Sequence, residues 1–290
     1  MKIGAHVSTS GGISTAIDRA AAIGAEAIQI FASPPQSWRF TKHSQSEIDV
    51  FKEKAIEHNI ETVFFHGVYL INLGSEKGEN LEKAIVSLTQ TLEFCSQIGG
   101  TGVIFHSGSH KGRGYDAIFE QAVSVCEKIL EQTPDDTYLI IENSAGMGNH
   151  IGSKFYEIGR MISALDSPRV KVCLDTQHTF AAGYDIAKTE TLELAMKEFE
   201  QEIGLNRLMA VHANDSKTAF ASGVDRHENI GEGHIGREGF LNVLRHPAFR
   251  DIPFILEVPG MESTGPDREN IDRLKALRQS VLENSDGRQV

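Results

Sequence analysis

Six short apolar runs in this sequence are each followed directly by a residue that can bind a metal ion. These six residues are His66, His106, Glu142, Asp175, His212 and Glu257, separated by 40, 36, 33, 37 and 45 residues. Imidazole and carboxylate groups together are ligands for zinc, manganese or iron, whereas calcium and magnesium prefer oxygen ligands alone. One histidine in such a position is more often a hydrogen-bonded structural residue, but six residues in equivalent positions favour a metal site.

Three further candidate ligands lie just beyond these runs. His178 follows Asp175 by three residues, which places both side chains on one face of a first helical turn. Asp225 and His227 flank Arg226, and alternate residues of an extended loop point the same way. A catalytic zinc ion typically takes about three protein ligands, so nine residues can serve three metal ions, with carboxylates free to bridge.

The chain as a whole is acidic, with 28 Lys and Arg residues against 40 Asp and Glu residues and a formal net charge of −12. This net charge argues against non-specific binding to nucleic acid. Three divalent ions would nevertheless give the four candidate carboxylates a local charge of +2 and would bring the chain from −12 to −6. Such a cationic cavity suits an anionic substrate, for example a phosphodiester.

Eight short apolar runs alternate with longer amphipathic stretches along the chain. The runs cover residues 2–5, 27–30, 62–65, 102–105, 138–141, 170–174, 208–211 and 253–256, and their length and composition are typical of buried parallel strands. Helical patterns over 13–23, 80–98 and 115–130 lie between them, and Gly99-Gly100 marks the end of the second helix. We therefore predict a (β/α)8 TIM barrel whose metal site lies at the C-terminal ends of the strands. A doubly wound sheet is the alternative, because periodicity does not separate the two folds.

Length and composition indicate one globular unit. We expect residues 1–290 to form a single barrel domain with a frayed end over 283–290. The cysteines Cys95, Cys126 and Cys173 are widely spaced, which favours a reducing compartment over a disulfide framework. The sequence shows no signal-peptide pattern and no apolar run of membrane-spanning length, so we expect a cytoplasmic monomer that does not bind membranes.

Two further patterns receive structural interpretations. The segment GEGHIG over residues 231–236 matches G-x-G-x-x-G, but polar residues precede it where a dinucleotide-binding fold needs a strand, so we predict a rim loop. Four histidines lie near strand ends or rim loops, where they either orient metal ligands or bond to backbone; these are His6, His110, His150 and His234.

Eight segments of the sequence resemble the endonuclease IV family, which comprises metal-dependent apurinic/apyrimidinic endonucleases of DNA repair. The segments are GAHVSTSGG, HGVYLINLG, FHSGSHKG, IENSAGMG, CLDTQHTFAAGYD, HANDSK, VDRHENIGEG and LEVPG. They run in order from residue 1 to about residue 260, and the most specific are LDT-x-H-x-FAAGYD and DRH-x-x-x-GEG. The resemblance therefore covers nearly the whole chain.

The resemblance implies three Zn²⁺ ions and hydrolysis of the phosphodiester 5′ to abasic sites in duplex DNA, which leaves 3′-OH and 5′-deoxyribose phosphate ends. It also implies that blocked 3′ ends are substrates and that Mn²⁺ is an alternative at one metal position. Glu142 would be the catalytic residue and would bridge two ions. The implied ligand sets are His66, His106 and Glu142 for the first ion; Glu142, Asp175, His212 and Glu257 for the second; and His178, Asp225 and His227 for the third.

Recognition of the lesion would fall to the rim loops. The resemblance implies that Tyr69 and Leu70 enter the duplex where the base is missing. Lys111 and Arg226 are candidates for contacts with phosphate groups, together with four more basic residues of predicted rim loops: Arg113, Lys154, Lys217 and Arg237. The loop over residues 32–39 departs from the family pattern, because Pro34-Pro35-Gln36-Ser37 stands where a basic side chain is expected.

Two other functions remain open. A sugar isomerase or epimerase of similar barrel type would need one divalent metal ion held by Glu142, Asp175, His212 and Glu257. The other five candidate ligands would then have no use. A non-catalytic metal-binding or nucleic-acid-binding barrel would instead have saturated coordination.

Overall fold

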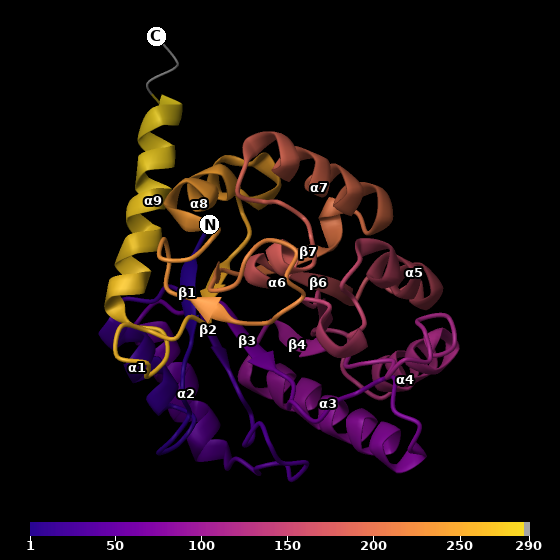
Figure 1. Cartoon of the computed structure of the whole chain (residues 1–290). Helices are drawn as coiled ribbons and strands as arrows, with labels where there is room; N and C mark the ends of the chain where they lie inside the picture. Colours follow the sequence, from indigo (N-terminus) through magenta and orange to yellow (C-terminus); the bar gives the residue numbers. More distant parts are fainter. Residues whose placement is uncertain (287–290) are drawn as a thin grey trace.

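The computed structural model describes residues 1–286, and these residues form a closed barrel of eight parallel strands (Figure 1). The barrel strands are β1 (Ile3–His6), β2 (Ile28–Ile30), β3 (Val63–His66), β4 (Gly102–His106), β5 (Tyr138–Glu142), β6 (Val170–Asp175), β7 (Leu208–His212) and β10 (Phe254–Leu256). They follow one another around the barrel in sequence order, and pairing of β1 with β10 closes it. The predicted TIM barrel is confirmed, and the doubly wound alternative is wrong.

Eight helices of the described residues surround the strands. They are α1 (Thr15–Ile23), α2 (Gln45–Glu57), α3 (Gly78–Ile98), α4 (Phe119–Glu131), α5 (Phe155–Leu165), α7 (Thr189–Glu202), α8 (Gly236–Arg245) and α9 (Arg268–Asp286). Neighbouring helices of this ring contact each other, and α9, drawn in yellow, packs beside α1 and α8 (Figure 1). The short helix α6 (Thr176–Ala181) lies apart from the ring and contacts β6 and β8.

Smaller elements complete the described chain. The strands β8 (Asp215–Ser216) and β9 (His227–Glu228) form an antiparallel hairpin outside the barrel. Three short 3₁₀ helices span Met147–Asn149, Leu205–Arg207 and Pro247–Phe249. Within residues 1–286 no helix is both long and apolar enough to cross a membrane.

Local sequence signals explain several helix ends. Ser44 and Glu47 form a capping box at the start of α2, in which each side chain bonds to the other's backbone N–H. Gly24 and Gly99 end α1 and α3 in the left-handed conformation that glycine adopts without a Cβ clash. The predicted helix over 115–130 begins later, at Phe119, because residues 115–118 form a separate turn in which the Ile118 N–H donates to the Tyr115 carbonyl. Helix α9 runs to Asp286, and the rest of the expected frayed end lies outside the described residues.

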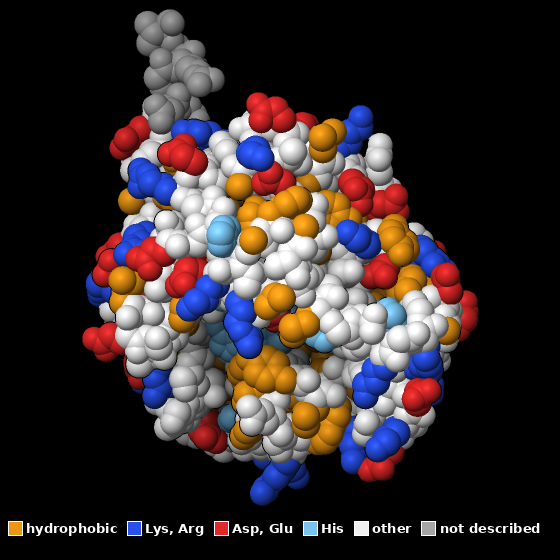
Figure 2. Space-filling view, viewed as in Figure 1, with side chains coloured by type: hydrophobic (Ala, Val, Ile, Leu, Met, Phe, Trp, Pro, Cys, Tyr) orange, Lys and Arg blue, Asp and Glu red, His pale blue; other side chains and the backbone are white. Residues whose placement is uncertain are grey.

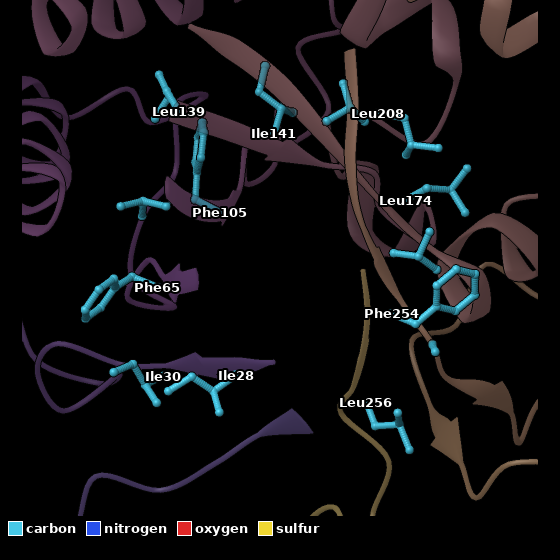
Figure 3. Close-up of a cluster of buried hydrophobic side chains, with 14 of the residues drawn as sticks. Ile28, Ile30, Phe65, Phe105, Leu139, Ile141, Leu174, Leu208, Phe254 and Leu256 are labelled. Carbon is cyan, nitrogen blue, oxygen red and sulfur yellow. The ribbon is translucent and has the colours of Figure 1, made fainter. Parts of the chain in front are cut away.

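The core has two layers, one on each face of the barrel wall. Alternate strand residues point outward against the helices, and Figure 3 shows part of this outer layer, including Ile28, Phe65, Phe105 and Ile141. The residues between them fill the barrel with a small apolar layer: Ala27, Phe64, Ile104, Ile140, Cys173, Ala210 and Ile255. Cys173 is therefore a core residue.

Glycine occupies the equivalent inner position of β1. A Cβ atom built on Gly4 would lie 2.2 Å from the carbonyl oxygen of Ala27, the residue directly before β2. Any side chain there would push β1 away from β2, so the closed barrel requires glycine at this position.

Candidate metal centre

Six of the nine predicted ligands lie in one plane of the barrel because of strand periodicity. Each follows an apolar inner residue by two positions, so it points to the same inner face, one layer closer to the C-terminal rim. His66 follows Phe64 in this way, and Glu142 follows Ile140. The same relation holds for His106, Asp175, His212 and Glu257. The barrel thus carries a polar layer directly above its apolar filling.

The other three predicted ligands come from elements just above the strands. His178 lies in α6, whose first turn is capped by Asp175: one carboxylate oxygen accepts from the His178 N–H at 2.7 Å. Asp225 and His227 come from the segment that leads into β9 and from β9 itself. Asp225 oxygens lie 3.3 Å from His178 Nε2 and 3.5 Å from His227 Nε2. All nine predicted residues therefore meet in one region.

Within this region, three groups have ligand atoms that lie within 4.8 Å of one another. The groups are His66, His106 and Glu142; Glu142, Asp175, His212 and Glu257; and Asp175, His178 and His227. The first two match the sets that the sequence resemblance implied. The third contains Asp175, which the resemblance did not assign there, while Asp225 faces both of its imidazoles.

Glu142 occupies the centre of the cluster and is fully buried. Its Oε2 atom lies 3.3 Å from His66 Nε2 and 3.5 Å from His106 Nε2. Its Oε1 atom lies 3.0 Å from His212 Nδ1 and 3.2 Å from His178 Nδ1. The two carboxylate oxygens therefore face different sets of imidazoles, which is the arrangement a bridging ligand requires.

The electrostatics of the cluster keep the Glu142, Glu257 and Asp225 carboxylates ionised, whereas burial raises the pKa of Asp175. Burial by itself would raise the pKa of Glu142, but the nearby His106 and His212 imidazoles hold that pKa well below its usual range. Burial would likewise raise the pKa of Asp225, but His178, His227 and His106 bring it to about 2. Burial lowers the pKa of His106 to about 4, which favours a neutral imidazole with a free lone pair. Ionised carboxylates and neutral imidazoles are the forms that bind metal ions.

Two buried imidazole nitrogen atoms among the nine candidate ligands have no hydrogen-bond partner in the described part of the chain. These are Nε2 of His178 and Nε2 of His227, both in the third group. An unpartnered buried polar atom is costly, and such atoms usually point to a missing ion or water. Their position opposite the Asp175 and Asp225 carboxylates fits a divalent cation, so the residues present suit the metal ions that the sequence implied.

Four residues that we did not predict as ligands hold the ligands in place. Asn143 accepts a hydrogen bond from the Asp175 N–H at 2.7 Å. Asn214 donates to Asp175 Oδ2 at 2.7 Å and accepts from the Glu257 N–H at 2.8 Å. His6 and Gln29 both contact Glu257, through Nδ1 at 2.7 Å and Nε2 at 2.6 Å. The two-residue spacing from the apolar inner layer would have identified Gln29 from the sequence, because it follows Ala27.

The GEGHIG segment encloses a carboxylate of this same chain. Asp215 is fully buried, and it accepts hydrogen bonds from the backbone N–H groups of Gly231, Gly233 and Ile235 at 2.9–3.0 Å and of Gly236 at 3.2 Å. A Cβ on Gly233 would lie 2.4 Å from the Ser216 carbonyl oxygen. The segment is thus a rim loop, as predicted, and its glycines allow close approach to Asp215.

A cavity of about 340 Å³ opens onto the candidate ligands. Tyr69, Ser144 and His150 line it together with candidate ligands from all three groups. Figure 2 shows histidine side chains at the bottom of a hollow, with hydrophobic side chains and Lys or Arg side chains at its edge. A large substrate can therefore reach the ligands from this face.

The predicted DNA-contacting residues lie on the rim. The side chains of Tyr69 and Leu70 are 60% and 39% exposed, and the Tyr69 ring packs edge-on against Phe31 and His66. Lys111 and Arg226 are exposed. Of the other basic residues, Arg113 and Lys154 bond to backbone carbonyls, and Lys217 lies 3.7 Å from Glu228.

Comparisons with known proteins agree with this architecture. Residues 17–279 match the family described as xylose isomerase-like TIM barrel. A protein of Halothermothrix orenii named probable endonuclease 4 is 38% identical over 276 residues, which cover 95% of this chain and 99% of that protein. A protein of Methanoculleus marisnigri with the same name is 36% identical over 277 residues, covering 95% of this chain and 98% of its own.

Solved structures separate the family from the wider fold. The crystal structure of endonuclease IV from Thermus thermophilus aligns with a TM-score of 0.85 at 33% identity, covering 97% of this chain and 100% of that one. A D-tagatose 3-epimerase-like protein aligns with a TM-score of 0.75 at 17% identity over the full length of both chains, which shows a shared fold only. The near-complete coverage and the identity to its relatives show that this chain belongs to the endonuclease IV family.

Proposed function

We propose that this chain is a metal-dependent apurinic/apyrimidinic endonuclease, which hydrolyses the phosphodiester 5′ to abasic sites in duplex DNA and leaves 3′-OH and 5′-deoxyribose phosphate ends. The observation that carries the proposal is Glu142, a fully buried carboxylate whose two oxygens face two different pairs of imidazoles. Family membership supports the same reaction.

We further propose that the centre holds three Zn²⁺ ions, with Mn²⁺ as the alternative at one position. His66, His106 and Glu142 would hold the first ion, and Glu142 would share the second with Asp175, His212 and Glu257. His178, Asp225 and His227 would hold the third, where Asp175 is a further donor within reach. When bound, paired divalent ions lower the pKa of water and stabilise the negative charge that develops on a phosphate group.

The residues of the chain then have separable tasks in the reaction. Glu142, the catalytic residue in this proposal, keeps the first two ligand groups at a fixed separation because one carboxylate belongs to both. The four candidate carboxylates also set the charge of the cavity: together they carry −4, so three divalent ions would leave +2 toward an anionic substrate. The apolar filling of the barrel below this layer keeps water from reaching the ligands from that side.

The rim residues would recognise the damaged duplex. Tyr69 and Leu70 are exposed beside the cavity, where they can fill the space left by a missing base. Lys111 and Arg226 are exposed cations that can contact phosphate groups on either side of the lesion. The same cavity would accept blocked 3′ ends, because the reaction there is also hydrolysis of a phosphate ester.

The sugar isomerase alternative uses only part of this site. It needs Glu142, Asp175, His212 and Glu257, which form one of the three groups. The other five candidate ligands lie in the same region, and one mononuclear reaction would leave them without a role. The nuclease proposal gives each of the nine a role.

The test combines incision of an end-labelled duplex that carries one abasic site with measurement of metal content. We expect cleavage on the 5′ side, a 3′-OH end and about three metal ions per chain. No incision with about one metal ion per chain would contradict the proposal and favour the isomerase. Incision by wild type without bound metal would contradict the metal-dependent mechanism.

A variant pair makes the test specific to Glu142. Glu142→Gln removes the charge shared by two ligand groups, so we expect incision to fall at least about 100-fold while the circular dichroism spectrum stays unchanged. Glu262→Gln removes the same charge from an exposed residue beyond β10 and should retain wild-type activity. Full activity of Glu142→Gln would refute the bridging role.

A further inference from the structure

Gln29 is a fully buried amide in the polar layer of the barrel. It is the middle residue of β2, two positions after Ala27 of the apolar inner layer. Burying an amide costs free energy unless its oxygen and nitrogen both find hydrogen-bond partners. At this position the partners are side chains of the metal centre.

The contacts of Gln29 join two candidate ligands. Its Oε1 atom lies 2.7 Å from His212 Nε2, and its Nε2 atom lies 2.6 Å from Glu257 Oε1. The same Nε2 atom lies 2.9 Å from His6 Nδ1, which itself lies 2.7 Å from Glu257 Oε1. One amide thus spans two ligands from different strands, β7 and the end of β10.

The chemistry of these partners determines which way the amide points. A carboxylate only accepts hydrogen bonds, so Glu257 must face the NH₂ group of Gln29 and not its oxygen. The amide oxygen is then left facing His212, and because this oxygen only accepts, Nε2 of His212 must carry a proton. The Nδ1 atom of a neutral His212 imidazole is then the one with a free lone pair.

That lone pair points at the metal centre. His212 Nδ1 lies 3.0 Å from Glu142 Oε1, 3.3 Å from Glu257 Oε2 and 3.9 Å from Asp175 Oδ2, the other members of the same ligand group. We propose that Gln29 is a positioning residue that fixes the tautomer of His212 and the orientation of Glu257, so that both present their free electron pairs to one metal ion. This inference rests on the proposed metal centre but not on the DNA substrate.

The first test replaces Gln29 by an apolar side chain of similar length. Gln29→Met removes both hydrogen bonds and keeps most of the volume, so one of three zinc equivalents should bind about 10–100-fold more weakly in competition with a chelator. In ¹⁵N-histidine-labelled, zinc-loaded protein, the His212 Nε2–H proton should lose its protection from solvent exchange. Zinc affinity within twofold of wild type for all equivalents, or an unchanged Nε2–H signal, would overturn the proposal.

Gln29→Glu keeps the hydrogen bond with His212 and removes the one with Glu257, so it tests the two contacts separately. It also remains informative if the Met variant folds poorly. Its carboxylate still accepts from His212 Nε2–H but no longer donates to Glu257. We expect the His212 signal to be retained while the zinc equivalent that Gln29→Met weakens also changes in affinity. Loss of the His212 signal in this variant would contradict the acceptor role of the amide oxygen.

Gln121→Met is the matched control. Gln121 lies in α4 and donates to the backbone carbonyls of Leu73 and Ser75, away from the ligands, so its loss should lower stability without changing zinc affinity. Equal weakening of zinc binding in the Gln121 and Gln29 variants would reduce Gln29 to a structural role and overturn the proposal. Failure of the wild-type protein to bind zinc at these groups would instead contradict the proposed metal centre.

Discussion

Replacing Asp215 by Asn should release the rim loop that follows the ligand hairpin. Oδ1 of Asp215 accepts from Ser216 and Ile235, and Oδ2 accepts from Gly231 and Gly233. The Gly236 N–H lies 3.2 Å from both oxygens. An Asn side chain offers only one oxygen, and in either orientation its NH₂ group faces at least two backbone N–H donors. The change therefore removes two hydrogen bonds and leaves donors facing donors.

The expected magnitude follows from these bonds. Hydrogen bonds to a charged group contribute about 1.5–3 kcal/mol each, so the loss of two amounts to about 3–6 kcal/mol. The loop can open while the barrel stays folded, so we expect the loss to appear as local opening rather than global unfolding. A free-energy difference of about 1.4 kcal/mol changes an equilibrium constant tenfold, so a loss of about 3 kcal/mol raises the equilibrium constant for loop opening at least about 100-fold.

Native-state hydrogen exchange measures this opening directly. The amides of Gly231 and Gly233 should exchange about 100-fold faster in Asp215→Asn than in wild type. Asp267→Asn is the matched control, because Asp267 also accepts from backbone N–H groups, those of Met261 and Asn270, but holds a different loop. A change of less than threefold at Gly231 and Gly233 in a folded Asp215→Asn protein would refute the assignment of the loop to Asp215.

Two further predictions concern the rim residues Tyr69 and Leu70 and the ion pair between Glu26 and Arg278 of α9. Tyr69→Ala combined with Leu70→Ala should lower the preference for abasic over intact duplex about tenfold in competition binding at fixed salt. The reason is that an apolar side chain inserted at the lesion offsets the free-energy cost of unstacking the bases. An unchanged preference would show that both residues only pack the loop. Glu26→Gln should destabilise the protein by about 1–2 kcal/mol at pH 7, since the carboxylate is only partly buried. Burial would raise the pKa of Glu26, but hydrogen bonds from Arg278 lower it to about 2, so its stabilisation is present above about pH 4.5 and is lost as the pH falls toward 2. Urea unfolding of both proteins should therefore converge near pH 2, and a constant difference between pH 7 and pH 2 would contradict this ion pair.

The sequence by itself determined the strands and most of the ligand layer. Short apolar runs can form a parallel barrel only when alternate residues face inward, so a residue two positions after Ile140 or Ala210 must lie in the layer above them. This local periodicity placed Glu142 and His212 without any knowledge of what surrounds them. The spacing also placed His178 in the first turn after Asp175, because both belong to one helix start.

Only the tertiary structure decided how these residues are combined. Asp175 joins the group of His178 and His227 because β9 brings His227 Nε2 to 3.6 Å from Asp175 Oδ2, a contact that no spacing predicts. Gln29 and Glu257 are 228 residues apart and meet because β1 lies between β2 and β10 in the closed barrel. Periodicity fixes the face of a strand on which a side chain lies, whereas its hydrogen-bond partners depend on which strands become neighbours.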